Sequence, residues 1–391
     1  MTQAVRHDSM RARNLEVVLG EVSRGGPLTR AAVAERTGLT KSTVSKLVGD
    51  LVDAGILAES GLTRAGERGR PGVEVVLSGN RVASLGLEIN VGYLAVCLLD
   101  LAGEVRLTLR LARDNRGSAP DEVLAELQVL AAEALDEADR LGFTLAGAGL
   151  AVSGPVGDGL LLSAPHLGWQ DVRPGEMLDL PVPVELDNEA NFAALGEVWF
   201  GAGELDFLYV SGEVGIGAGL VLDGALFRGA HGLAGELGHV VVSPDGPPCR
   251  CGGRGCLEAY AGQEALLAAA GGPATIADLV ALVKGGDQRA ELACAEAGRA
   301  LGLALASAVN LLDLDRIVLG GIFAPLFGWL SGPAEQILRE RLGRLRGSVP
   351  TVTSSRLGAS AATLGAAGRV VHRVIAEPGP FLAAHREARE A

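Results

Sequence analysis

Apolar residues recur every three or four positions along the first fifty residues of the chain. This spacing predicts an amphipathic helix over Met10–Arg24. Two shorter helical segments follow, Thr29–Arg36 and Thr40–Ala54, and each opens on a threonine that can cap a helix. Gly38 separates them, at a position where a left-handed residue carries little steric cost. Two short helices joined by a glycine turn predict a helix-turn-helix.

A polar stretch that contains arginines follows the third helix and leads into the apolar segment Val73–Leu77. This pattern is typical of a β-wing, whose tip arginines would enter the DNA minor groove, where the potential is negative. The first turns of the third helix present cations and small hydroxyls, which suit base edges and phosphates. The candidate DNA contacts are Lys41, Ser42, Thr43, Ser45, Lys46, Arg68 and Arg70. The alternative is a helical oligomerisation or adaptor domain with a solvated basic loop.

From Arg81 the apolar pattern becomes that of strands, and after Asp206 a similar series of strands and helices starts again. The predicted elements are strands Val82–Ile89, Tyr93–Asp100, Glu104–Ala112 and Gly147–Ser153 with helix Asp121–Leu141, then strands Phe207–Gly212, Gly217–Leu222, Ala225–Phe227 and Arg316–Leu319. This duplication favours an α/β fold of two similar lobes with a cleft between them. The expected organisation is a winged helix-turn-helix over residues 1–80, a first lobe over 81–205 and a second over 206–391.

The charge of the chain is unevenly distributed. The whole sequence of 391 residues carries a net charge of −13, but residues 1–80 hold 11 Lys and Arg against 9 Asp and Glu, a net charge of +2. A near-neutral head on an acidic body agrees with DNA binding by the head. The longest apolar run, Ile317–Leu330, contains Pro325 and is too short to span a bilayer. The N-terminus lacks a signal-peptide pattern, so a cytoplasmic protein without a membrane segment is expected.

Three of the five cysteines fall within eight residues, at Cys249, Cys251 and Cys256. An odd cysteine count and this crowding argue against a disulfide framework and for a metal. His239, ten residues upstream, can complete a tetrahedral set of three cysteines and one histidine, which is a common structural zinc site. We therefore expect one structural zinc per chain, with buried or redox cysteines as the alternative.

Two motifs resemble those of the ROK family (repressors, open reading frames and sugar kinases). GLAGELGHVVVSPDGPPCRCGGRGCLEAYAG, from Gly232 to Gly262, is similar to the family signature, and LDNEANFAALGE, from Leu186 to Glu197, to its catalytic segment. The resemblance implies an actin-like, hexokinase-like fold with a sugar in the interlobe cleft. It also points to the same four zinc ligands.

Planar polar side chains that can hold adjacent hydroxyls are the expected sugar contacts. In the family, the matching positions contact the hexose, and in this chain they carry carboxylates, an amide and an imidazole. The candidate ligand-binding residues are Gly154, Asn188, Glu189, Glu236, His239 and Glu258. His166 would lie on the near wall, where family members often have asparagine.

The positions that serve phosphoryl transfer in ROK kinases differ in this chain. Glu189 stands where the kinases carry an aspartate base. Glu88–Gly92 replaces a loop that resembles Asp-Ile-Gly-Gly-Thr, and Gly212–Gly217, with Glu213, replaces Gly-Thr-Gly-x-Gly. These changes predict no catalytic residue, only a vestigial base position at Glu189, and no nucleotide cofactor.

The combined patterns favour a transcriptional regulator of the repressor type that binds a double-stranded DNA operator and senses a sugar or sugar phosphate. A single recognition helix reads few bases, so a homodimer or homotetramer is expected. Two alternatives remain: an ATP-dependent sugar kinase with an appended DNA-binding head, and a regulator controlled by a protein partner.

Overall fold

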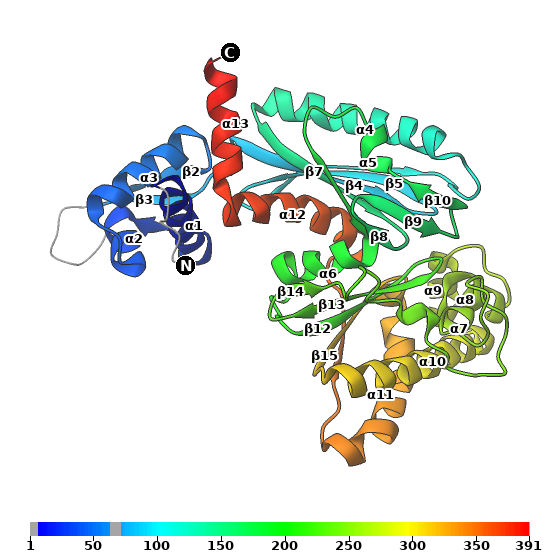
Figure 1. Ribbon diagram of the computed structural model, residues 1–391. Helices are drawn as coiled ribbons and strands as arrows, with labels where there is room; N and C mark the ends of the chain where they lie inside the picture. Colours follow the sequence, from blue (N-terminus) through cyan, green and yellow to red (C-terminus); the bar gives the residue numbers. More distant parts are fainter. Residues whose placement is uncertain (1–6, 63–71, 391) are drawn as a thin grey trace.

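The computed structural model describes residues 7–62 and 72–390, which form a small N-terminal domain and two larger lobes (Figure 1). The N-terminal domain is a winged helix with a three-stranded sheet of order β1-β3-β2. Its elements are α1 (His7–Gly25), β1 (Leu28–Thr29), α2 (Arg30–Thr37), α3 (Lys41–Asp53), β2 (Leu57–Leu62) and β3 (Val73–Leu77). The predicted helix-turn-helix is confirmed, although α1 begins three residues earlier than its apolar stripe suggested.

The predicted caps are also present. The Thr29 side chain accepts a hydrogen bond from the amide of Ala32, and the Thr40 side chain accepts one from the amide of Thr43, both at 3.2 Å. Gly38 has a φ of 71°, in the left-handed region that favours glycine. These local interactions fix where α2 ends and where α3 starts.

The two lobes contain sheets of the same topology. In each, an antiparallel three-stranded meander is extended by two parallel strands, in the order β11-β7-β4-β5-β6 in the first lobe and β14-β13-β12-β15-β16 in the second. The strands are β4 (Val82–Ile89), β5 (Tyr93–Asp100), β6 (Val105–Ala112), β7 (Thr144–Val152) and β11 (Val184–Asn188), then β12 (Phe207–Gly212), β13 (Ile216–Leu222), β14 (Ala225–Phe227), β15 (Arg316–Gly321) and β16 (Thr351–Ser354). The predicted duplication is therefore real at the level of topology.

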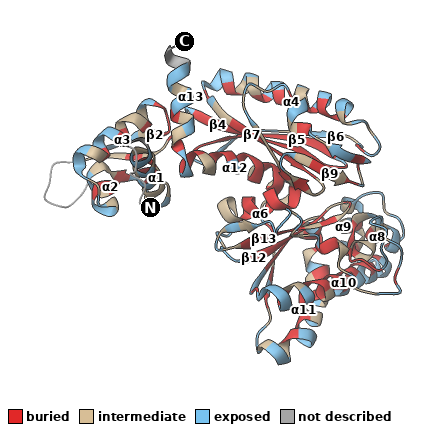
Figure 2. Cartoon of the chain, viewed as in Figure 1, coloured by how far each residue is buried: buried red, intermediate tan, exposed pale blue. Residues whose placement is uncertain are grey.

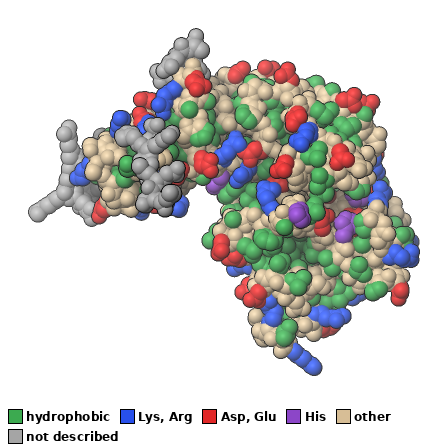
Figure 3. Space-filling view, viewed as in Figure 1, with side chains coloured by type: hydrophobic (Ala, Val, Ile, Leu, Met, Phe, Trp, Pro, Cys, Tyr) green, Lys and Arg blue, Asp and Glu red, His purple; other side chains and the backbone are tan. Residues whose placement is uncertain are grey.

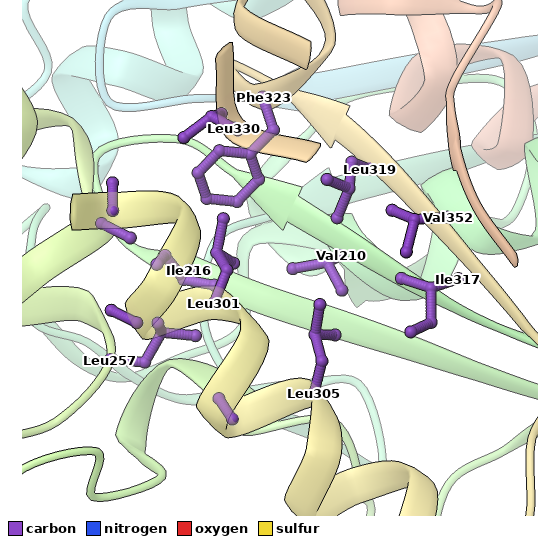
Figure 4. Packing of buried hydrophobic residues seen from close by; sticks show 14 of the residues in the cluster. Val210, Ile216, Leu257, Leu301, Leu305, Ile317, Leu319, Phe323, Leu330 and Val352 are labelled. Carbon is purple, nitrogen blue, oxygen red and sulfur yellow. The ribbon is translucent and has the colours of Figure 1, made fainter. Parts of the chain in front are cut away.

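Each lobe has its own apolar core. In the first lobe, α4 (Pro120–Leu141) covers one face of the sheet, and the small sheet β8 (Val156–Gly157), β9 (Leu160–Ala164) and β10 (Trp169–Val172) and the short α5 (Pro174–Met177) extend that core. In the second lobe, α10 (Gln288–Leu312) and α11 (Phe323–Arg346) pack together beside the sheet, and Figure 4 shows Leu301 and Phe323 near Val210. Shorter elements complete this lobe: η1 (Leu237–His239), α7 (Glu258–Ala261), α8 (Gln263–Ala269), α9 (Ile276–Lys284) and η2 (Gly358–Ser360).

Helix α10 is long and apolar enough to cross a membrane by those two criteria alone. However, 61% of its most apolar window is buried within the chain. A buried core helix passes the same test, and the contacts of α10 with α11, α7 and α8 place it in the second-lobe core.

The helix that follows the last strand of each lobe packs on the other lobe. Helix α6 (Glu189–Phe200) leaves β11 and packs on β13 and β12 of the second lobe, whereas α12 (Ala361–Ala376) leaves the second lobe and packs on β4, β7 and β5. The sequence placed all of residues 206–391 in the second lobe, but the chain after β16 returns to the first. Figure 2 shows α12 with buried residues along much of its length.

Helices α6 and α12 also pack against each other, closely enough that backbone meets backbone. A Cβ on Gly365 of α12 would overlap the carbonyl oxygen of Phe192 on α6, and one on Gly86 of β4 would overlap the carbonyl oxygen of Thr363, where α12 packs on the first-lobe sheet. Glycine is required at both positions because the approach leaves no room for a side chain.

The winged helix is anchored on the first lobe through α12 and α13 (Pro378–Glu390). One apolar cluster combines Leu15 and Leu19 of α1 with Val371 and Val374 of α12 and with Leu382 of α13. The winged helix therefore shares a core with the helix that crosses the lobe interface.

Replacement of Gly365 by alanine should disrupt this crossing. We expect Gly365→Ala to lower the free energy of unfolding by about 3 kcal/mol, near the top of the range for overpacked cores, measured as a shift of the urea midpoint. Gly328→Ala is the matched control, because Gly328 lies within α11 and an added Cβ there meets no atom within 4 Å. The control should be neutral or stabilising by up to about 1 kcal/mol. Equal midpoints for the two variants would contradict the close approach described here.

Candidate functional site

A cleft of about 320 Å³ lies between the lobes, and it brings together all six residues expected to contact a ligand. Figure 3 shows histidine side chains along the line where the two lobes meet. Gly154, Asn188 and Glu189 line the cleft from the first lobe and the start of α6, and Glu236, His239 and Glu258 line it from the second lobe.

The start of α6 fixes the first-lobe side of the cleft. Asn188 ends β11 and caps α6, since its Oδ1 accepts from the amide of Ala190 at 2.8 Å. Its Nδ2 donates to the carbonyl oxygen of Gly154 at 2.9 Å, which leaves one N–H of the amide for a ligand. Glu189 is the first residue of α6 and is buried.

Asp187, two residues before Glu189, is held by contacts of its own and is not free to act as a base. Its carboxylate is buried and accepts from the Asn191 side chain at 2.9 Å and from its neighbour's amide at 2.8 Å. It also pairs with Arg228 at 2.5 Å, so a residue that follows β14 holds the last strand of the first lobe. This interlobe ion pair was not expected from the sequence.

The opposite wall joins the lobes through His166 and Glu258. Nε2 of His166, between β9 and β10, lies 3.5 Å from Oε1 of Glu258, while the other oxygen of Glu258 accepts from the amide of Ile216 at 3.2 Å. Burial raises the pKa of Glu258, but the His166 contact and the Ile216 amide outweigh it and the net pKa is lowered. Glu258 is therefore an anion that can accept hydrogen bonds from ligand hydroxyls.

The four residues predicted to bind a metal converge beside the cleft. One ligand atom from each of His239, Cys249, Cys251 and Cys256 lies within 4.8 Å of the other three. The Sγ atoms of Cys251 and Cys256 are 3.7 Å apart, and Sγ of Cys249 is 3.7 Å from Nδ1 of His239. A tetrahedron with metal–sulfur bonds of about 2.3 Å has edges of about 3.8 Å, so these separations fit a tetrahedrally held ion.

His239 serves both sites. Its Nδ1 faces the cysteines, and its Nε2 lies 3.9 Å from Oε2 of Glu236 on the rim of the cleft. Partial burial raises the pKa of Glu236, while His239 opposes that shift and the charge of Glu258 adds to it. A metal on Nδ1 would fix the imidazole so that Nε2 points to the cleft.

Glu189 belongs to a cluster of three acidic residues that the sequence did not reveal as a unit. We call Glu88 of β4, Glu189 of α6 and Glu213 of the β12–β13 turn the carboxyl cluster. Burial raises the pKa of Glu88 and of Glu189 to about 7 and that of Glu213 to about 8, and the mutual repulsion of the three groups adds to the shifts of Glu189 and Glu213. The sequence marked the three positions separately, Glu189 at the base position and Glu88 and Glu213 in the two loops, but gave no sign that they lie together.

Tyr93 and Arg110 hold one side of this cluster. The Tyr93 hydroxyl donates to Oε1 of Glu88 at 2.6 Å, and the Arg110 guanidinium lies 3.6 Å from the centre of the Tyr93 ring. Oε2 of Glu88 has no hydrogen-bond partner in the part of the chain that the structure describes. Such a buried oxygen is costly to ionise.

The predicted DNA-contacting side of α3 faces away from the domain core. Lys41, Ser42, Ser45 and Lys46 are exposed, and Thr43 is half-buried. The Ser42 and Thr43 hydroxyls lie 3.0 and 2.8 Å from Oγ1 of Thr40, so part of their hydrogen-bonding capacity serves the helix cap. Arg68 and Arg70 lie outside the described residues.

Comparison with known protein families finds two matches. Residues 84–372 match the model of the ROK family, and residues 17–68 match that of the MarR family. The first match covers both lobes and the second covers the helices of the N-terminal domain.

Similar individual proteins include regulators and kinases. A xylose repressor of Caldicellulosiruptor bescii is 30% identical over 349 residues, which cover 83% of this chain and 86% of the repressor. The crystal structure of a ROK family transcriptional regulator, a homologue of the E. coli MLC protein, has a TM-score of 0.80 at 26% identity, with 96% of this chain and 98% of that chain covered. A ROK family glucokinase from Streptomyces griseus in complex with glucose and AMPPNP has a TM-score of 0.63 at 25% identity and covers 73% of this chain and 98% of its own.

Proposed function

This chain belongs to the ROK family, and from that membership we propose that it is a DNA-binding repressor of carbohydrate metabolism that responds to a sugar in its interlobe cleft. The observation that carries the proposal is the cleft itself, because six residues from separate segments line it beside a metal-binding set. The same chain carries a winged helix, and the two regulators reported above match 83% and 96% of this chain, against 73% for the glucokinase.

Helices α6 and α12 offer a direct connection between the cleft and the DNA-binding domain. Helix α6 begins at Glu189 in the cleft and packs along α12, and α12 shares an apolar core with α1. A sugar that bridges Glu189 on one side and Glu236 or Glu258 on the other would favour a closed cleft. Movement of α6 would then be passed through α12 to the winged helix, and so change the spacing of paired recognition helices.

A sugar kinase is the second candidate, because the glucokinase of known structure shares the two-lobed fold. Three features of the cleft oppose it. The side chain of Glu189 is one methylene longer than the aspartate of the family kinases, which shifts a base by about 1.5 Å, and a displacement of about 1 Å can reduce a rate ~100-fold. In the first kinase loop Asn90 and Val91 replace the paired glycines that let the backbone approach a phosphate, and in the second loop Glu213 adds a buried acid.

Contacts with DNA are assigned to the exposed start of α3. Lys41 and Lys46 would neutralise phosphates, and Ser42, Thr43 and Ser45 would face the groove. Arg68 and Arg70 are assigned to the wing from the sequence alone. The operator is double-stranded DNA, and a homodimer or homotetramer would read two half-sites.

Exposed leucines on the second lobe support a role in assembly. Most apolar side chains of α10 and α11 are buried in the second-lobe core, but Leu311 is 85% exposed and Leu345 is 76% exposed near the ends of these helices. Their burial between subunits would remove apolar surface from water. We place the assembled regulator in the cytoplasm, where its operator lies.

Removal of either lysine should weaken operator binding. We expect Lys41→Ala and Lys46→Ala each to reduce affinity three- to tenfold and to lower the slope of log K against log salt by about 0.9 per lost phosphate contact. The measurement is fluorescence anisotropy with an operator selected from random duplexes. Lys284→Ala, which alters the third lysine of the chain on α9, is the control and should bind like the wild type. Unchanged affinity and slope for both α3 variants would exclude this face of α3.

The metal site is assigned to a structural zinc held by His239, Cys249, Cys251 and Cys256. The ion would brace the loop that carries Glu258 and fix the His239 ring. Purified protein is expected to contain one zinc per chain by elemental analysis, and Cys251→Ala is expected to lose most of it on dialysis against a weak chelator. Cys294→Ala, on α10, should keep it. Full zinc content in Cys251→Ala, or none in the wild type, would rule out this assignment.

The cleft residues should control the response to sugar and not DNA binding itself. We expect a free aldose, from a panel that begins with D-xylose, to reduce operator affinity at least tenfold without any nucleotide and without phosphorylated product. An effector with ~100-fold preference for one form supplies about 2.7 kcal/mol, enough for this shift. Glu236→Gln should abolish the response and leave sugar-free DNA binding intact.

The matched control is Glu126→Gln on α4, since Glu126 and Glu236 both have 46% of the side chain exposed and only Glu236 lines the cleft. A normal sugar response in Glu236→Gln would move the effector site elsewhere. ATP-dependent phosphorylation of the sugar by wild-type protein would favour the kinase.

A further inference from the structure

The cleft carries far more negative than positive groups. Four glutamates line it, Glu189, Glu213, Glu236 and Glu258, and Glu88 lies directly behind two of them. Among the described lining residues the groups able to carry positive charge are His166, His239 and Arg250.

Each of these three groups already faces a partner, and only Nε2 of His239, 3.9 Å from Oε2 of Glu236, is directed to the cleft. Nε2 of His166 is against Glu258, Nδ1 of His239 is directed to the cysteines, and Arg250 pairs with Glu264 at 2.9 Å. A phosphate ester carries a charge of about −1.5 to −2 at neutral pH and is normally held by arginine, lysine or a row of backbone N–H groups.

We infer that the effector is an uncharged monosaccharide, and that the carboxyl cluster of Glu88, Glu189 and Glu213 excludes sugar phosphates and nucleotides from the cleft. This inference rests on the proposed function, since it names the class of ligand for the same site.

The geometry supports selection by charge as well as by shape. The three carboxyls come from three different elements of the two lobes: Glu189 of α6 and Glu213 of the β12–β13 turn line the cleft, and Glu88 of β4 lies close enough to both to raise their pKa. Glu88 is only 2% exposed, and one of its oxygens lacks a partner among the residues described. Water cannot screen an anion well at such a buried position, so like charges repel strongly. A neutral hydroxyl can instead donate to an ionised carboxylate or accept from a protonated one.

Several groups set the charge of the cluster. Tyr93 of β5 and Arg110 of β6 face Glu88, Asn90 lies beside Glu88 and Glu213, and Glu236 faces Glu189. Tyr209 of β12 lies near Glu189 and Glu213 and stays protonated because burial raises its pKa. Arg110 is the one cation among these named groups and lowers the pKa of Glu88 and Glu213, but burial outweighs it in both. The cluster therefore gains negative charge as the pH rises through about 7 to 8.

The test is isothermal titration of the full chain with matched pairs of a free sugar and its ester. The pairs are D-xylose with D-xylose 5-phosphate and D-glucose with D-glucose 6-phosphate, and AMPPNP serves as the nucleotide probe. We expect the sugar that binds to do so at least tenfold more tightly than its ester, and AMPPNP not to bind. Between pH 7 and 8.5 the ester stays almost fully ionised, because its second pKa is about 6. An increase in the ratio of sugar affinity to ester affinity over this range would therefore reflect the ionisation of the protein carboxyls.

Glu213→Gln removes one ionisable group from the cluster and should reduce the ratio of sugar affinity to ester affinity severalfold. Glu126→Gln should leave this ratio unchanged. Where Glu213→Gln does not fold, the pH series on the wild type decides. An ester that binds more tightly than its sugar overturns this inference and leaves the proposed function standing. If the ratio of sugar affinity to ester affinity changes neither with pH nor in Glu213→Gln, the carboxyl cluster is not what excludes the ester. If operator DNA binds but no sugar or ester does, sugar sensing itself fails, and the inference fails with it.

Discussion

The arrangement of the winged helix and the two lobes depends on one contact, the close crossing of α6 and α12. Each helix follows the last strand of one lobe and packs on the sheet of the other, so the two lobes are joined by exchanged helices and not by a simple hinge. The crossing needs Gly365 opposite the backbone of Phe192, because any side chain there would separate the helices. A shift of one helix must therefore be followed by the other, since packed interiors respond by discrete rearrangement and not by compression.

This crossing also explains why one chain can join a ligand cleft to a distant DNA-binding domain. The first residue of α6 lines the cleft, and the C-terminal half of α12 belongs to the same apolar cluster as α1. The interlobe ion pair of Asp187 with Arg228 and the contact of His166 with Glu258 lie on the cleft side of the crossing. A ligand bound in the cleft, as proposed, would therefore act on the same pair of helices that supports the winged helix.

Charge distinguishes this cleft from that of a phosphoryl-transfer enzyme. A kinase must stabilise negative charge as the phosphoryl group moves, and it does so with N–H groups, cations and magnesium. Here three buried carboxyls lie at the corresponding end, and burial raises their pKa to about 7 or 8, so that they are partly ionised near pH 7 and become more negative above it. Their environment suits hydroxyl groups and opposes anions, which agrees with a sensor built on a sugar-kinase scaffold.

The amino-acid sequence by itself determined the features that depend on near neighbours in the chain. Thr29, Gly38 and Thr40 mark the helix-turn-helix because caps and left-handed turns are local interactions. The metal set was predicted from the spacing of Cys249, Cys251 and Cys256, and the six cleft residues from segments that resemble those of the ROK family. Each of these signals lies within a short continuous segment of the sequence.

Only the tertiary structure decided what depends on contacts across long separations. The return of α12 to the first lobe, the pairing of Asp187 with Arg228 and the assembly of Glu88, Glu189 and Glu213 join segments that are between 24 and 283 residues apart. No local pattern predicts such pairs, because an acidic residue at a strand end has the same sequence context whether it lies in a solvated loop or in a buried cluster. The ionisation of such a residue, and therefore its role, depends on which other charges the fold places beside it and on how much water the fold excludes.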